Sequence, residues 1–144
     1  MRLATLTTAF FAAAAMSACA PALDAVVDET REWRGTLDAT AEGDIRAAAT
    51  ANSTPAGTAV AVSIADAPTG GTHAWHVHRG TCANPGEVVG DPQAYPALRP
   101  DAGGSANARA VLTRRPLMRG QDYIVGIHQG ATVDTPVIAC VNLQ

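Results

Sequence analysis

His73-Ala74-Trp75-His76-Val77-His78 holds three of the four histidines of this 144-residue chain. The stretch is typical of a β-strand, in which successive side chains point to opposite faces. His76 and His78 therefore share one face, whereas Trp75 and Val77 are expected to enter a core on the other. A pair of imidazoles above an apolar face is typical of a metal site built on a sheet, because imidazole nitrogen binds copper and zinc.

Six further stretches are typical of short strands separated by turns. We expect these strands at residues 34–40, 44–51, 58–64, 107–113, 121–128 and 136–143. One face of the third is formed by the alternating residues Thr58, Val60, Val62 and Ile64. The last strand alternates in the same way through Val137, Ala139, Val141 and Leu143. Residues 46–50 also have helix propensity, so the strand expected there has an alternative.

Seven short strands without a convincing helix or an internal repeat predict an all-β fold. We expect an antiparallel β-sandwich or flattened barrel with Greek-key connections. The segment from Cys82 to Gly104 is rich in proline and glycine and shows no sustained period. We expect it to be a long irregular loop, and loops of this length are often functional.

The N-terminus is typical of a secretion signal covering residues 1–18. Arg2 precedes an apolar run that is too short to span a bilayer. The run ends in Met16-Ser17-Ala18-Cys19, which is similar to a bacterial lipobox and predicts that Cys19 is the lipidated first residue of the mature protein. Cleavage after Ala20 is the alternative. With Cys19 as the first mature residue, we expect residues 19–30 to be a tether and residues 31–144 the folded domain.

These features predict a lipid-anchored protein of the cell envelope or periplasm. Ala20 after the lipidated cysteine weakly favours the outer membrane. The net charge of −3, with ten arginines and no lysine, gives nucleic-acid binding no electrostatic support. The sequence therefore indicates contact with a membrane only through the lipid, and it leaves a homodimer open.

The chain has three cysteines, and an odd number in an exported protein needs an explanation. If Cys19 carries lipid, Cys82 and Cys140 remain, and an oxidising compartment would allow them to form a disulfide. Two unpaired buried cysteines are the alternative.

The fourth histidine, His128, lies on the face of its strand that also carries Gly126. It can join His76 and His78 around one ion if the two strands are close, and a link between the cysteines would favour that arrangement. Gly126 would leave room beside such a site. His73 falls on the Trp75 face, so it is expected to be a buried supporting group rather than a ligand.

The chain resembles the copper/zinc superoxide dismutase family. The family motif H-G-F-H-V-H stands here as His73-Ala-Trp-His-Val-His78, and a cysteine follows it in both, here Cys82. Three later stretches are also similar to the family, and they are Tyr95–Gly104, Tyr123–His128 and Ile138–Cys140. The resemblance covers residues 34–144. It implies a copper ion held by His76, His78 and His128, with His73 in support and a disulfide between Cys82 and Cys140.

The departures from the family are as informative. Family members have further histidines for zinc in the loop that here runs from Cys82 to Gly104, and this loop has none. Glu87, Asp91 and Asp101 alone do not make a nitrogen-rich zinc site, so we expect one copper ion and no zinc. The family also has an arginine three residues before the last cysteine, where Val137 stands here.

Three functions follow from these expectations. The first is a copper-dependent superoxide dismutase that converts superoxide to oxygen and hydrogen peroxide. The second is a copper-binding module of the envelope that buffers or transfers the metal without catalysis. The third is a structural domain that has lost the metal. Copper stoichiometry separates the third from the others, and turnover by the copper-loaded protein separates the first two.

Overall fold

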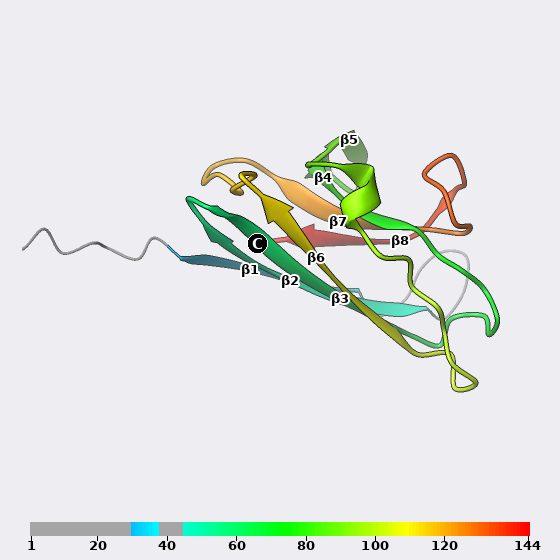
Figure 1. The fold of residues 1–144 in the computed structure, drawn as a ribbon. Coiled ribbons are helices and arrows are strands. Elements are labelled where there is room, and N and C mark those ends of the chain that lie inside the picture. Colours follow the sequence, from blue (N-terminus) through cyan, green and yellow to red (C-terminus); the bar gives the residue numbers. More distant parts are fainter. Residues whose placement is uncertain (1–29, 38–44) are drawn as a thin grey trace, which may run out of the picture.

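A computed structural model describes residues 30–37 and 45–144 of the chain as two antiparallel sheets of four strands each (Figure 1). The first sheet has the order β1-β2-β3-β6, and its strands are β1 (Arg31–Leu37), β2 (Arg46–Thr54), β3 (Gly57–Ala65) and β6 (Ala106–Thr113). The second has the order β5-β4-β7-β8, and its strands are β4 (Trp75–Thr81), β5 (Asn84–Val88), β7 (Tyr123–His128) and β8 (Val137–Leu143). The all-β, antiparallel prediction is confirmed.

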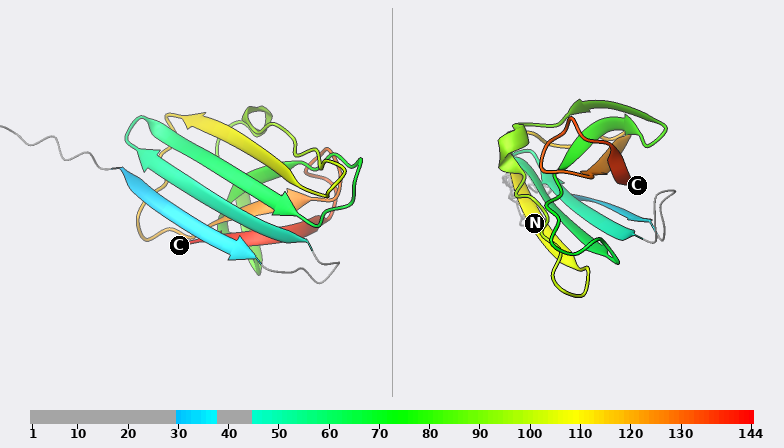
Figure 2. Two further views of the ribbon diagram at one scale, coloured as in Figure 1. Left: turned by 90° about the horizontal axis from the view of Figure 1, so that it is seen from below. Right: turned by 90° about the vertical axis from the view of Figure 1, so that its right-hand side faces the viewer.

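The two sheets pack face to face around one core (Figure 2). Strands β2, β3, β4, β6, β7 and β8 supply alternate apolar side chains to it, and the predicted inner face of β3, from Thr58 to Ile64, is buried. Chain connections cross between the sheets, so β6 returns to pair with β3 and β7 returns to pair with β4. This connectivity places β4 and β7, the two histidine strands, side by side in the middle of one sheet.

Most predicted strands form, with shifted ends. The first covers Arg31–Leu37 rather than 34–40, and residues 38–44 lie outside the described ranges. Residues 46–50 belong to β2 and not to a helix, because pairing with both β1 and β3 overrides local propensity. The signal at residues 1–18, Cys19 and nearly all of the tether are also outside the described ranges. Within those ranges, no helix is long and apolar enough to cross a membrane.

The sequence predicts an irregular loop from Cys82 to Gly104, and this prediction is wrong for part of the segment. It contains β5 and a short 3-10 helix, η1 (Pro92–Ala94). Strand β5 is not predicted because it contains Pro85 and Gly86, and both residue types are unfavourable in a strand interior. They are tolerated because β5 is an edge strand that pairs only with β4, through an irregular register beside His78.

The alternation predicted for β8 is wrong at its first residue. Val137 is 46% exposed and Ile138 is buried instead. The register of β7 with β8 shifts between Ile127 and His128, which leaves Ile138 as an extra residue. Such a bulge changes the direction of neighbouring side chains and is common beside functional sites.

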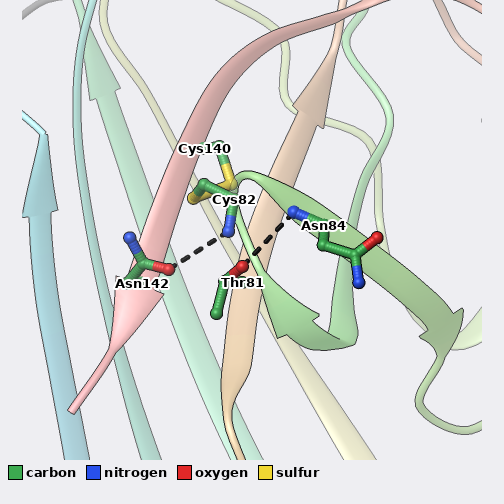
Figure 3. Close-up of a disulfide and its surroundings, with 5 residues drawn as sticks. All are labelled: Thr81, Cys82, Asn84, Cys140 and Asn142. Atoms are coloured by element: carbon green, nitrogen blue, oxygen red, sulfur yellow. Dashed lines mark hydrogen bonds between the residues drawn. A yellow bond between two sulfur atoms is a disulfide. The ribbon is translucent and has the colours of Figure 1, made fainter.

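Cys82 and Cys140 are joined by a disulfide that ties the β4–β5 turn to β8 (Figure 3). Asn142, two residues along β8, accepts a hydrogen bond from the backbone N–H of Cys82 at 3.2 Å. Thr81 accepts another from the backbone N–H of Asn84 at 3.3 Å. The turn that leads into the edge strand β5 is therefore fixed to β8, the strand at the other edge of the sheet. Disulfides persist in oxidising compartments, which favours a location outside the cytoplasm.

Replacing both cysteines, in C82S/C140S, is expected to lower the free energy of unfolding by about 4 kcal/mol, because the bond closes a loop with a sequence separation of 58 residues. Urea unfolding of the metal-free chain measures the change. Asn142→Ala is the control, since it removes the neighbouring hydrogen bond but keeps the covalent link. A double variant as stable as the parent chain would show that the link contributes nothing.

Candidate metal centre

The three imidazoles of His76, His78 and His128 converge on the outer face of the second sheet. Their ring centroids are 5.8–6.2 Å apart, and each ring offers one nitrogen within 4.8 Å of the other two. Strand β4 carries two of these residues, and β7 ends in the third. Because β4 pairs His76 with Gly126 and His78 with Ile124, His128 lies just beyond the paired positions, on the same face.

One nitrogen of each of the three rings has no hydrogen-bond partner. These nitrogens are Nδ1 of His76, Nε2 of His78 and Nε2 of His128, and all three are buried. A buried nitrogen without a hydrogen-bond partner lowers the stability of the fold by about 1–3 kcal/mol. The three rings together carry three such nitrogens. A metal ion at the centre would satisfy all three at once, so the group can hold one.

The opposite ring nitrogens are held by backbone carbonyls. Nδ1 of His78 lies 3.0 Å from the oxygen of Gly86, and Nδ1 of His128 lies 2.9 Å from that of Thr135. His76 has a backbone hydrogen bond to Pro92, whose only backbone hydrogen-bonding group is an acceptor. An imidazole N–H that donates to a carbonyl leaves the other nitrogen with a free lone pair. Each ring is therefore fixed in the tautomer that a metal ligand needs.

The electrostatics of the site favour a neutral His76 ring. Burial, followed by repulsion from His128 and His78, lowers the pKa of His76 from 6.5 to about 4, and the hydrogen bond with Pro92 opposes this only in part. His76 is thus unprotonated at neutral pH. Metal binding does not have to displace a proton from it.

An aromatic wall closes the site behind His76. The ring of Tyr95 lies 5.0 Å from that of His76 and 5.0 Å from that of Trp75. The Tyr95 hydroxyl donates to the oxygen of Val89 at 2.6 Å, and the Trp75 indole donates to that of Pro96 at 2.7 Å. These bonds fix the segment that carries η1, and with it the carbonyl of Pro92. Burial raises the pKa of Tyr95, so its hydroxyl stays protonated.

His73 does not join the three converging rings. It is buried, and its Nδ1 lies 3.0 Å from the backbone oxygen of His128, so it can support the end of β7. Its backbone also pairs with Leu98 on both sides. The role that fits these contacts is to hold the backbone of one candidate ligand.

The three acidic residues of the segment after Cys82 do not gather at the histidines. Asp91 caps η1 by accepting from the N–H of Gln93, and Asp101 accepts from two N–H groups of its own turn. Glu87 is exposed on β5. Among the described residues, the histidine group is the one cluster of three or more that could hold a metal ion.

Sequence reasoning missed the three carbonyl acceptors. Gly86 reaches His78 through the irregular pairing of β5, and Thr135 reaches His128 from the loop before β8. The Thr135 hydroxyl accepts from the N–H of Gly130 and donates to the oxygen of Thr132, which closes that loop on itself. Every residue has a backbone carbonyl, so no residue type in the sequence predicts which carbonyls accept these hydrogen bonds.

Comparison with models of known protein families, with curated proteins and with solved structures finds no match for this chain.

The metal-free protein is expected to lose stability as the pH falls from about 6.5 to about 4. Over this range the unfolded chain binds a proton at residue 76 that the folded chain excludes. Lowering the pH from 7 to 5 is expected to reduce the free energy of unfolding by about 2 kcal/mol through His76. Urea unfolding at both pH values measures the difference, and His76→Gln should remove it. An equal loss in the variant would assign the pH dependence to other groups.

Gly126 provides the space in which the His78 ring lies. A Cβ at this position would be 3.5 Å from Cδ2 and Nε2 of His78, which is an ordinary contact. Gly126→Ala should therefore keep metal binding. Gly126→Val adds branches that enter the space of the ring, and it should weaken metal affinity at least ~10-fold, since a misplaced ligand is lost. Competition titration with a chromophoric chelator measures both variants, and equal affinities would contradict this geometry.

Proposed function

We propose that the protein binds one copper ion through His76, His78 and His128. The observation that carries the proposal is the set of three buried, unpartnered nitrogens on rings whose opposite nitrogens face carbonyls. Three neutral imidazoles suit copper(I) and can also hold copper(II) with an open position. Copper also binds nitrogen sites more tightly than other divalent metals of its row. No zinc is included, because no nitrogen-rich second cluster lies among the described residues.

We further propose that the copper-loaded protein converts superoxide to oxygen and hydrogen peroxide. Bound copper would accept an electron from one superoxide, which leaves as oxygen, and return it to a second, which takes up two protons and leaves as hydrogen peroxide. The chain supplies a ligand set compatible with both oxidation states. His78 is the least buried of the three histidines, so a small anion and solvent protons would reach the centre on its side.

The residues around the site keep its shape during such a cycle. The carbonyls of Gly86 and Thr135 hold the rings of His78 and His128 from behind. Tyr95 and Trp75 fix the segment that faces His76. A site whose ligands do not move between oxidation states needs little reorganisation for each electron transfer.

A second function, copper buffering or transfer without catalysis, is favoured by one observation. Val137, which pairs with His128 across the β7–β8 bulge, is an exposed apolar residue. A positive side chain at this position would attract an anion, and electrostatic attraction raises association rates for charged substrates. A dismutase with this surface is expected to be slower than one with an arginine there.

The proposed location is the cell envelope, with the chain exported and anchored through lipid on Cys19. The disulfide supports an oxidising compartment. Lipid attachment and the outer membrane rest on the sequence of residues 16–20 alone.

Metal analysis and a superoxide assay on the same preparations test both steps. The parent chain is expected to bind one copper and to consume superoxide. His128→Ala should lower copper affinity at least ~100-fold, because two imidazoles remain, and it should abolish turnover. Gln129→Ala, at the exposed neighbour of His128, is the control and should retain both properties.

The outcomes separate the alternatives. One bound copper without turnover would assign the protein to buffering or transfer. Turnover that persists in His128→Ala would place any activity elsewhere. A parent chain that binds no copper would leave a structural domain and overturn the proposal.

A further inference from the structure

The loop between β6 and β7 has a charge unlike that of the whole chain. It carries three of the ten arginines, Arg114, Arg115 and Arg119, and all three are exposed. None of them forms an ion pair with a residue in the described ranges. Met118 lies between them and is 52% exposed. Since the chain has a net charge of −3, this positive and partly apolar surface is a local feature.

Buried and half-buried hydrogen bonds fix the loop to the sandwich. The N–H of Leu117 donates to the hydroxyl of Ser53 at 2.8 Å, and the hydroxyl of Thr58 donates to the oxygen of Arg115 at 2.8 Å. The N–H of Met118 donates to the hydroxyl of Tyr123 at 3.0 Å. Leu117 is 2% exposed. The backbone that carries the three arginines is therefore held in place by the sandwich.

The loop lies at the end of the sandwich where the chain enters β1 (Figure 1). A surface hollow of about 250 Å³ is lined by residues of both, among them Arg31, Pro55, Pro116 and Met118. A second hollow brings Arg119 beside Thr30 and Arg31. We name this surface, residues 114–120 with Arg31, the arginine pole.

The arginine pole lies away from the three histidines. Strand β7 begins at Tyr123, which binds the loop, and ends at His128, so its length separates them. A strand of this size spans roughly 17–20 Å. A surface that docks through the arginine pole would therefore leave the histidine face open.

We propose that the arginine pole docks on anionic lipid headgroups. Guanidinium groups bind phosphate oxygens in pairs, and an exposed methionine among them can enter the boundary between headgroups and acyl chains. The carboxylates closest in sequence to the three loop arginines and to Arg31 are Asp122, Glu32, Glu29 and Asp28, and Glu32 is paired with Arg34. Arg114, Arg115 and Arg119 outnumber Asp122, the one carboxylate of their loop, and this local excess of positive charge complements a membrane surface.

The position of the chain's entry supports a membrane as the partner. Residues 1–29 precede the described fold and join it at this pole. If Cys19 carries lipid, the segment from there to Arg31 spans at most roughly 40 Å when fully extended. A tether of that length keeps the pole at a high effective concentration near the bilayer. The docking proposal itself does not depend on the copper site.

Vesicle co-sedimentation of the full-length chain tests the proposal. The N-terminal segment is the same in every variant, so the comparison is between phosphatidylcholine vesicles with and without phosphatidylglycerol. The parent chain is expected to bind the anionic vesicles at least ~10-fold more tightly, and this preference should disappear in R114Q/R115Q/R119Q, because each arginine near such a surface is worth about a five-fold change in affinity. High salt should reduce the preference in the same way.

R46Q/R99Q/R109Q is the matched control, since it removes the same charge at exposed positions away from the pole. It should keep the preference for anionic vesicles. Equal losses in the two triple variants would reduce the effect to net charge and overturn the proposal. So would a preference unchanged in R114Q/R115Q/R119Q, or binding of duplex DNA as tight as that of the vesicles. Thermal unfolding of each variant establishes that it is folded.

Discussion

The candidate site depends on the antiparallel pairing of β4 with β7. This pairing places His76 opposite Gly126 and carries His128 to the same face, so that three imidazoles from two distant segments meet. A shift of one residue would turn every side chain of the strand to the other face. Trp75 and Val77 prevent such a shift, because both are fully buried in the core and could not be exchanged for histidines without a large cost.

The same pairing explains why the rings are held so firmly. The backbone acceptors come from elements that flank the two strands: β5, the segment with η1, and the loop before β8. The disulfide attaches the β4–β5 turn to β8, and the Thr135 hydroxyl closes the loop that faces His128. Each candidate ligand is thus oriented by backbone that is itself fixed. Preorganisation of this kind is what gives a metal site its affinity and selectivity.

Much of the fold could be predicted from the sequence, because strand alternation is a local property. The face shared by His76 and His78 follows from their spacing, and the inner face of β3 follows from Thr58 to Ile64. The edge strand β5 could not be predicted, since Pro85 and Gly86 are tolerated only where one side of the strand is unpaired. The exposure of Val137 depends on a bulge that tertiary pairing creates. The arginine pole likewise needs the fold, which brings Arg31 beside a loop more than eighty residues later.

The most direct test of the central claim is to count the nitrogens around the metal. Electron paramagnetic resonance of the chain loaded with one equivalent of copper(II), with natural and with ¹⁵N-labelled histidine, resolves coupling to each coordinated imidazole. The account predicts three imidazole nitrogens, falling to two in His128→Ala. A parent spectrum with two or fewer, or one that is unchanged when residue 128 is replaced, would contradict it.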